Sequence, residues 1–184
     1  MANNLFAGRN EQELISKCLE NNKLAQQQMY DLLKGRMFAV CLRYVVDKEF
    51  AKDVFHDGFV ILFSKLETYK GEGSFEGWAR RIFVTTCLMH LRKNDVLKRS
   101  EQIDDYNASL QTDSTVFSKL EAKALLELVM QMPVGFRTVF NMYAIEGYTH
   151  EEIAKELNIT PGGSRSQLSR ARIWLQEKLK SKKY

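Results

Sequence analysis

The chain has 184 residues and a formal net charge of +4, with 27 Lys and Arg against 23 Asp and Glu, so its length fits one domain or two small ones. It contains no apolar run long enough to span a membrane and no basic, apolar start of the kind that signal peptides have, and we expect it to be cytoplasmic. Its three cysteines are widely spaced, which argues against a zinc site and a disulfide framework, so no metal or cofactor is expected.

The first half of the chain predicts helices joined by a short loop. Apolar residues recur at helical spacing from Leu24 to Val46 and again from about Glu49 to Leu66. The polar segment Glu67–Ser74, with two glycines, then predicts a loop. Ser74 is a suitable N-cap for a following helix, from about Phe75 to Lys93. Because few segments alternate polar and apolar residues, we expect an all-α fold.

The helix from about Glu49 to Leu66 has a second face beside its apolar core stripe. Two acids and a histidine lie there among aliphatic and polar residues: Asp53, His56, Asp57, Val60, Ile61 and Ser64. Such a mixture indicates a protein-binding patch. On composition alone, the alternative that Val60 and Ile61 pack under the N-terminal segment is equally open.

The helix from about Phe75 to Lys93 is basic, contains aromatic residues and follows a loop, a combination that suits single-stranded nucleic acid. Taken alone this signal is weak, because Trp78 and Phe83 at such spacing are more often core residues. Residues 95–115 then shift to Ser, Asp, Asn, Gln and Thr, which predicts a flexible acidic linker. We therefore expect two small helical domains, 24–94 and 116–184, with an N-terminal extension or first helix at 1–23.

The second domain predicts four short helices that end in a helix-turn-helix. Met132-Pro133 ends the first helix and Gly147 ends the second. Thr149 and Glu152 form a capping box for the third helix, and Thr160-Pro161 starts the fourth, which is basic. A short capped helix, a tight break and a basic helix predict that the last helix lies in the major groove of DNA.

The residue types in the last helix suit that role. Gly162 and Gly163 leave backbone amides open to a phosphate, and Arg165 projects from the first turns, where an arginine can bond guanine. Ser169 and Arg170 lie one turn further on roughly the same face, while Arg172 is better suited to a phosphate. The core-facing residues of the helix are Leu168, Ala171, Trp174 and Leu175.

The two halves together resemble one family, the extracytoplasmic-function (ECF) sigma factors of bacterial RNA polymerase, which belong to the sigma-70 family. The segments similar to sigma region four are Met132-Pro133, Phe136–Phe140 and Gly147–Arg172. Those similar to sigma region two, in the family's order and spacing, are Leu42–Tyr44, Ala51–Phe59 and Ser74–Ile82. The resemblance covers about Leu24 to Lys180 and leaves no room for a region-three domain between the halves.

The resemblance implies an initiation factor with three binding surfaces and no cofactor. Its partners would be core RNA polymerase, promoter DNA and an anti-sigma protein, and the acidic linker would thread toward the polymerase cleft. Core polymerase would be bound by Asp53, His56, Asp57 and Val60. The −10 element would be read and melted by Tyr69, Lys70, Gly71, Ser74, Arg80, Arg81, Thr85 and Arg92. The −35 duplex would be contacted by Thr149, Gly162, Ser164, Arg165, Ser166, Ser169, Arg170 and Arg172.

Three positions depart from the family pattern. Lys52 replaces a common acid, which bears on polymerase affinity. Thr85 stands where an Asn is usual and Met89 where Asp or Asn is usual, and both bear on the −10 preference.

Two other classes of protein are alternatives. An autonomous repressor or activator would also have a helix-turn-helix, but the order of motifs in residues 40–93 argues against it. An enzyme is disfavoured because no Ser/His/acid set, glycine-rich phosphate loop or metal cluster is present, and the three histidines are isolated.

Overall fold

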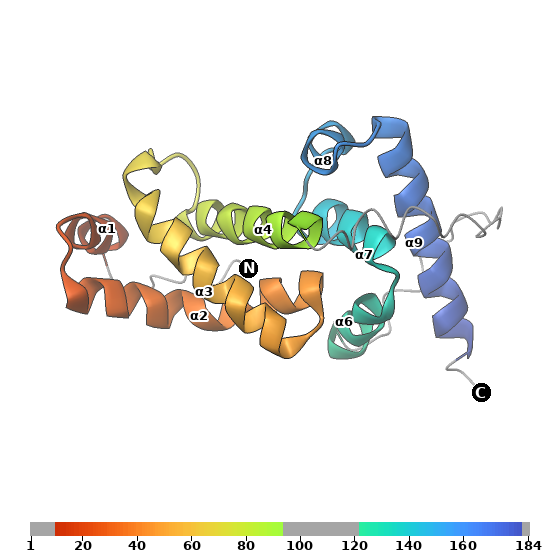
Figure 1. Ribbon diagram of the computed structural model, residues 1–184, viewed down its shortest axis with the longest axis horizontal. Helices are drawn as coiled ribbons and strands as arrows, with labels where there is room; N and C mark the ends of the chain where they lie inside the picture. The colour runs from red at the N-terminus through yellow and green to blue at the C-terminus, as the bar shows by residue number, and fades with distance from the viewer. Residues whose placement is uncertain (1–9, 94–121, 182–184) are drawn as a thin grey trace. The chain divides into compact units, whose positions relative to one another are not determined.

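The computed structural model describes residues 10–93 and 122–181, and every regular element in these two ranges is helical (Figure 1). The all-α prediction is therefore confirmed. The chain divides into two compact units, Met1–Cys87 and Leu88–Tyr184, and the division falls within helix α4 (Phe75–Lys93). The predicted linker at 95–115 lies outside the described residues.

The first unit is built from helices whose starts are fixed by short polar side chains. Its elements are α1 (Glu11–Leu19), α2 (Lys23–Val45), α3 (Lys48–Ser64), the 3₁₀ turn η1 (Leu66–Thr68) and the beginning of α4. Asn10, Asn22 and Asp47 each accept a hydrogen bond from a backbone amide in the first turn of α1, α2 and α3. These bonds satisfy amides that would otherwise lack a helical partner.

The core of the first unit depends on a close approach of α3 and α4. Gly58 of α3 faces the fully buried ring of Phe83, and a Cβ atom at position 58 would lie 2.4 Å from Phe83 Cε1. The ring of Phe59 meets the ring of Phe83 edge-on, with the centroids 5.2 Å apart. Cys41 and Cys87 are fully buried in the same unit.

The second unit has the predicted caps. Its elements are α6 (Ala122–Gln131), α7 (Val134–Phe140), the π-helical turn η3 (Asn141–Ile145), α8 (His150–Leu157) and α9 (Pro161–Ser181). Gly147 has a φ of +77°, Thr149 and Glu152 form the reciprocal capping box, and α9 begins at Pro161. The structure differs from the predicted regular helix after Phe140, where the chain widens into the π-helical turn η3.

A buried cation closes the end of α6. The guanidinium of Arg137, in α7, donates to the carbonyls of Met130 at 3.3 Å and Met132 at 2.8 Å. Burial lowers the pKa of Arg137 to about 10. A cation at a helix C-terminus also complements the partial negative charge of its last carbonyls, so Arg137 fastens α7 to the end of α6.

Candidate nucleic-acid interface

The start of α9 is fixed by the turn that joins it to α8. Asn158 ends α8 in the left-handed conformation, with a φ of 57°. The hydroxyl of Thr160 then accepts a hydrogen bond from the amide of Gly163 at 2.9 Å. The Gly163 amide is therefore used in the cap, and Gly162 is the exposed glycine of this turn.

Three polar residues of α9 form a stripe along the helix. Arg165, Ser169 and Arg172 are spaced i, i+4 and i+7, so they lie on one side of the helix. Arg165 and Ser169 are exposed, and Arg172 is half-buried. Gly162 and Ser166 are exposed next to them. Arg170 is turned about 100° away from Ser169, so it flanks this stripe instead of sharing it. Leu168, Ala171, Trp174 and Leu175 are buried, as predicted.

Arg165 is held only loosely before any DNA is bound. Its guanidinium lies 3.9 Å from the carboxylate of Glu151 in α8, and the two side chains are 59% and 72% exposed. An exposed ion pair of this kind contributes at most about 1 kcal/mol. Little free energy is therefore needed to separate Arg165 from Glu151.

Ser164 does not lie where the sequence placed it. We expected its side chain on the DNA-binding surface, but Ser164 is fully buried and its hydroxyl is 2.9 Å from Nδ1 of His150. The imidazole of His150 stacks on the ring of Tyr143, with the centroids 4.5 Å apart. Ser164 therefore joins the starts of α8 and α9. Its spacing from Leu168 and Ala171, i+4 and i+7, was the signal that it faces the core.

Thr149 is exposed, but its polar atoms serve the capping box. Its hydroxyl accepts from the Glu152 amide at 3.2 Å, and its own amide donates to the Glu152 carboxylate at 2.8 Å. These two bonds fix the start of α8, and a phosphate at Thr149 would compete with them.

The loop between η1 and α4 is folded back on itself. Gly71 and Gly73 have φ angles of +75° and +77°, a backbone conformation that favours glycine. The hydroxyl of Tyr69 donates to the carbonyl of Gly73 at 3.0 Å and so closes the loop. The Tyr69 ring contacts Phe75 and Trp78, with centroids 5.2 and 5.4 Å away. Burial and the carboxylate of Glu11 raise the pKa of Tyr69.

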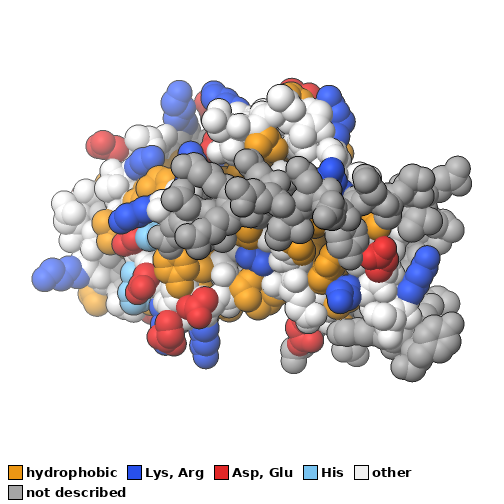
Figure 2. Space-filling model, turned by 45° about the vertical axis from the view of Figure 1, so that its right-hand side comes forward, with side chains coloured by type: hydrophobic (Ala, Val, Ile, Leu, Met, Phe, Trp, Pro, Cys, Tyr) orange, Lys and Arg blue, Asp and Glu red, His pale blue; other side chains and the backbone are white. Residues whose placement is uncertain are grey.

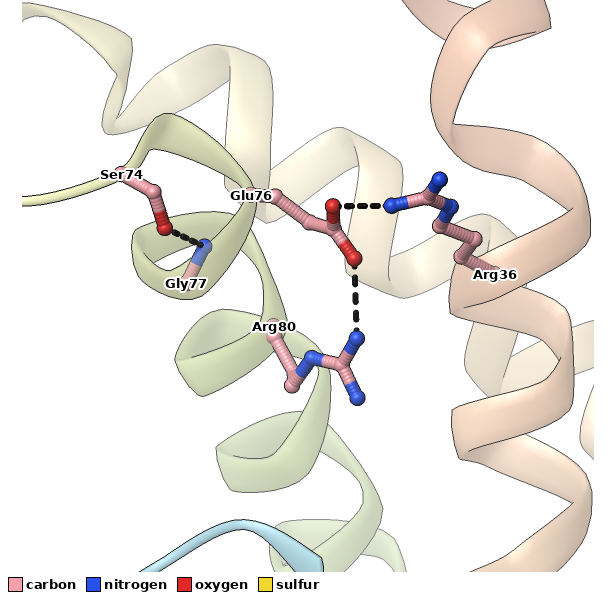
Figure 3. A network of polar contacts seen from close by, with 5 residues as sticks. All are labelled: Arg36, Ser74, Glu76, Gly77 and Arg80. Carbon is pink, nitrogen blue, oxygen red and sulfur yellow. Dashed lines mark hydrogen bonds and ion pairs between the residues drawn. The ribbon is translucent and has the colours of Figure 1, made fainter. Parts of the chain in front are cut away.

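The predicted −10 residues therefore separate into groups. Lys70, Gly71 and Ser74 are exposed on the loop, whereas Tyr69 is half-buried beneath it. On α4, Arg81, Thr85 and Arg92 recur at i, i+4 and i+11 and form one stripe, in which the Thr85 hydroxyl donates to the Arg81 carbonyl at 2.9 Å. Arg80 is turned about 100° from Arg81 and contacts Glu76 instead (Figure 3).

The second face of α3 is open to a partner. Asp53, His56 and Asp57 are exposed, and Val60 is 69% exposed, which counts against the alternative that Val60 packs under the N-terminal segment. Ile61 is half-buried. Lys52 lies beside this face and pairs with Glu49 at 2.8 Å, so the residue that departs from the family pattern is partly neutralised by its neighbour.

Charges do not collect into one broad patch on the face drawn in Figure 2. Among the described residues of that face, acidic, basic and hydrophobic side chains are interspersed.

Residues 10–93 and 122–181 contain no group of three His, Cys, Asp or Glu side chains placed to hold a metal ion. Within the same ranges, no helix combines the length and apolarity needed to cross a membrane.

Comparison with known families finds a match in each unit. The model of Sigma-70 region 2 matches residues 29–96, and the model of Sigma-70, region 4 matches residues 122–175. The ECF RNA polymerase sigma-E factor of Haemophilus influenzae is 23% identical over an aligned length of 181 residues, and the alignment covers 92% of this chain and 95% of that protein. The RNA polymerase sigma-H factor of Pseudomonas aeruginosa is 23% identical over an aligned length of 173 residues, and the alignment covers 88% of this chain and 90% of that protein.

A solved structure has the same fold. The sigma factor RpoE of Bartonella quintana, crystallised in complex with the anti-sigma factor NepR, aligns with a TM-score of 0.52 at 19% sequence identity. The alignment covers 84% of this chain and 96% of that one.

Proposed function

This chain belongs to the sigma-70 family as an RNA polymerase sigma factor of the ECF type, and from that premise we propose which of its side chains bind promoter DNA and polymerase. As a sigma factor it directs promoter-specific initiation of transcription. Sigma factors are non-catalytic initiation factors, and we infer that this chain performs no chemical step of its own. We propose 24–94 as region two, 95–115 as the linker and 116–184 as region four.

The −35 element is read as duplex by α9. Arg165 bonds a guanine through its two acceptors, because it is exposed, flexible and placed near the start of the helix. Ser169 adds a contact one turn further on, and Gly162 and Ser166 let the helix approach the phosphates. Arg172, at the end of the stripe, and Arg170, beside it, hold the DNA backbone.

The −10 element is read as an opened strand by the loop and α4. A base that leaves the stack costs a few kcal/mol, which contacts in the loop must offset. Lys70, Gly71 and Ser74 are exposed at the loop and meet that base, while Arg81, Thr85 and Arg92 line the adjacent side of α4. Tyr69 supports the loop from beneath through its bond to Gly73.

Core polymerase is bound by the second face of α3. Asp53, His56 and Asp57 supply polar contacts, and Val60, 69% exposed, supplies an apolar one. A protein interface with an aliphatic centre and a polar rim has this composition. Polymerase binding also covers Val60, which explains an apolar side chain exposed to water in the unbound chain.

An anti-sigma protein controls the access of this factor to polymerase. The support is the Bartonella quintana relative, which is bound to an anti-sigma factor in its crystal structure. We place the protein in the cytoplasm, where polymerase and the genome are, with no stable membrane association of its own.

The observation that carries the proposal is the exposed stripe of α9, presented by a helix whose start is fixed by Thr160. The test is run-off transcription with core bacterial polymerase on a pooled promoter library, with and without this protein. New start sites that share two spaced elements are expected. Tight duplex binding by the protein alone, with no polymerase binding and no new transcripts, would instead identify an autonomous regulator.

A further inference from the structure

One acidic residue at the start of α4 connects two arginines from different helices (Figure 3). Oε1 of Glu76 accepts a hydrogen bond from Nη2 of Arg80 at 2.9 Å, one turn along the same helix. Oε2 accepts from Nη1 of Arg36, which belongs to α2 and lies 40 residues earlier in the chain. The carboxylate is thus divided between two guanidiniums and holds them next to each other.

The burial of the three side chains places the carboxylate behind the two cations. The side chain of Glu76 is 18% exposed, whereas those of Arg36 and Arg80 are 36% and 31% exposed. Each contact with Glu76 engages one nitrogen of a guanidinium that carries five N–H donors. The two guanidiniums are therefore more accessible to solvent than the carboxylate that they share, and an anion that approaches from solvent meets them first.

The pair is also fixed in position relative to the loop. Ser74 ends the loop, and its hydroxyl accepts a hydrogen bond from the Gly77 amide at 3.1 Å, which caps the first turn of α4 (Figure 3). Glu76 lies within that turn. Because Arg80 is turned about 100° from Arg81, the pair stands beside the Arg81–Thr85 stripe instead of extending it.

We propose that Glu76 is a positioning residue, which holds Arg36 and Arg80 together as a site for one backbone phosphate of the opened −10 strand. This inference rests on the proposed function of the loop and α4. Backbone contacts position a strand while base contacts specify its sequence, and a planar guanidinium matches the oxygens of a phosphate. A base held by the loop needs such an anchor, because an opened strand has lost the stiffness of the duplex.

Replacement of Glu76 by Gln separates this proposal from simple charge attraction. Glu76→Gln keeps the size of the side chain and removes one negative charge. Simple attraction predicts tighter DNA binding, since one negative charge is lost next to the two arginines. A positioning role predicts the opposite, because two unrestrained guanidiniums repel each other and no longer meet one phosphate together.

The experiment uses holoenzyme reconstituted with the full chain and a forked promoter DNA whose −10 strand is already open. Its sequence is taken from the start sites found in the promoter library. We expect Glu76→Gln, Arg36→Lys and Arg80→Lys each to weaken binding of this DNA about tenfold. In the two lysine variants the positive charge is kept, but the planar, forked set of N–H donors of arginine is lost. Asp31→Asn, which removes an exposed carboxylate from the same α2 helix, should change nothing. Unchanged or tighter binding by Glu76→Gln overturns the proposal.

Neutral methylphosphonate linkages, placed one at a time along the open strand, give a readout that loss of folding cannot imitate. One linkage should weaken wild-type binding about tenfold and have little further effect on Glu76→Gln or Arg36→Lys. Independent, multiplying effects at every linkage overturn the proposal. If the wild-type protein directs transcription and Glu76→Gln binds the open strand as well as wild type does, this inference alone is overturned. If the wild-type protein directs no transcription, the proposed function is overturned as well.

Discussion

The two regions that we propose to bind DNA differ in how they hold their arginines in the unbound protein. On α9, Arg165 has one exposed carboxylate beside it, that of Glu151, 3.9 Å away. At the start of α4, Arg36 and Arg80 share the mostly buried carboxylate of Glu76. Duplex DNA is itself stiff, so a helix needs only to present mobile side chains to it. An opened strand is flexible, so the protein has to supply the order.

The largest expected effect comes from a change that loosens the ordered region alone. In Gly58→Val the new side chain would meet the buried ring of Phe83, which lies 2.4 Å from a Cβ at that position, and we expect a loss of about 3 kcal/mol in the stability of the first unit. Urea unfolding followed through Trp78, with Trp174 replaced by Phe, reports that unit. Gly35→Ala, with open space around its Cβ, should instead stabilise α2 by about 0.5–1 kcal/mol. Equal midpoints for wild type and Gly58→Val would show that α3 and α4 do not need this close approach.

The next effect tests Arg165, the exposed arginine of α9. Arg165→Ala should cost about 1–3 kcal/mol at one base pair of the −35 element and relax the preference there. Transcription from promoters with each single −35 substitution measures this. Arg172→Ala is the control, because a phosphate contact should weaken all sequences alike and lower the salt slope by about 1. If the Arg165→Ala protein keeps the same base preference at every −35 position, Arg165 does not contact a base.

A smaller effect distinguishes neighbours of α9 that the sequence treats alike. Ser164→Ala removes the buried bond to His150 and should cost the second unit about 1 kcal/mol of stability, with the −35 preference unchanged. Ser166→Ala, at an exposed position, should leave stability unchanged and weaken DNA binding. Thermal unfolding and duplex binding, measured on both variants, check the pair. If Ser164→Ala instead weakened DNA binding and left stability unchanged, Ser164 would belong to the DNA-binding surface.

The smallest effect concerns the loop. Tyr69→Phe removes the hydroxyl that closes the loop on Gly73, and we expect open-strand binding to weaken by about 0.5–1 kcal/mol. Because the pKa of Tyr69 is raised in the folded chain, its proton is held more tightly there than in the unfolded chain. The stability that this shift adds is present below about pH 10 and is lost as the pH rises through the raised pKa. Unfolding of wild type and Tyr69→Phe at pH 8 and at higher pH should show the difference shrink only above pH 10.

Much of the second unit follows from short-range sequence patterns. The Thr149–Glu152 box, the positive φ of Gly147 and the start of α9 at Pro161 depend on residues three or four positions apart. Caps of this kind are properties of the local backbone, so their residue types predict them. The exposed stripe of α9 follows equally from helical periodicity, once the core face is known.

The misplaced and missed residues depend on elements that are far apart in the chain. Ser164 was expected at DNA because it stands in a basic segment, but its partner His150 comes from another helix, 14 residues earlier. Tyr69 was expected to touch DNA, yet the folded loop turns its hydroxyl back onto Gly73. Arg36 belongs to a helix with no DNA-binding signal and was not singled out at all.

The sequence by itself determined the all-α class, the helix caps and the helix-turn-helix, because each rests on hydrogen bonds and spacing within one or two helical turns. Only the tertiary structure decided that Glu76 holds Arg36 and Arg80, that Ser164 is buried, and that Gly58 is where α3 meets α4. The physical reason is distance along the chain. Which side chains meet across two helices depends on how the helices approach and rotate, and no local pattern of residues specifies that.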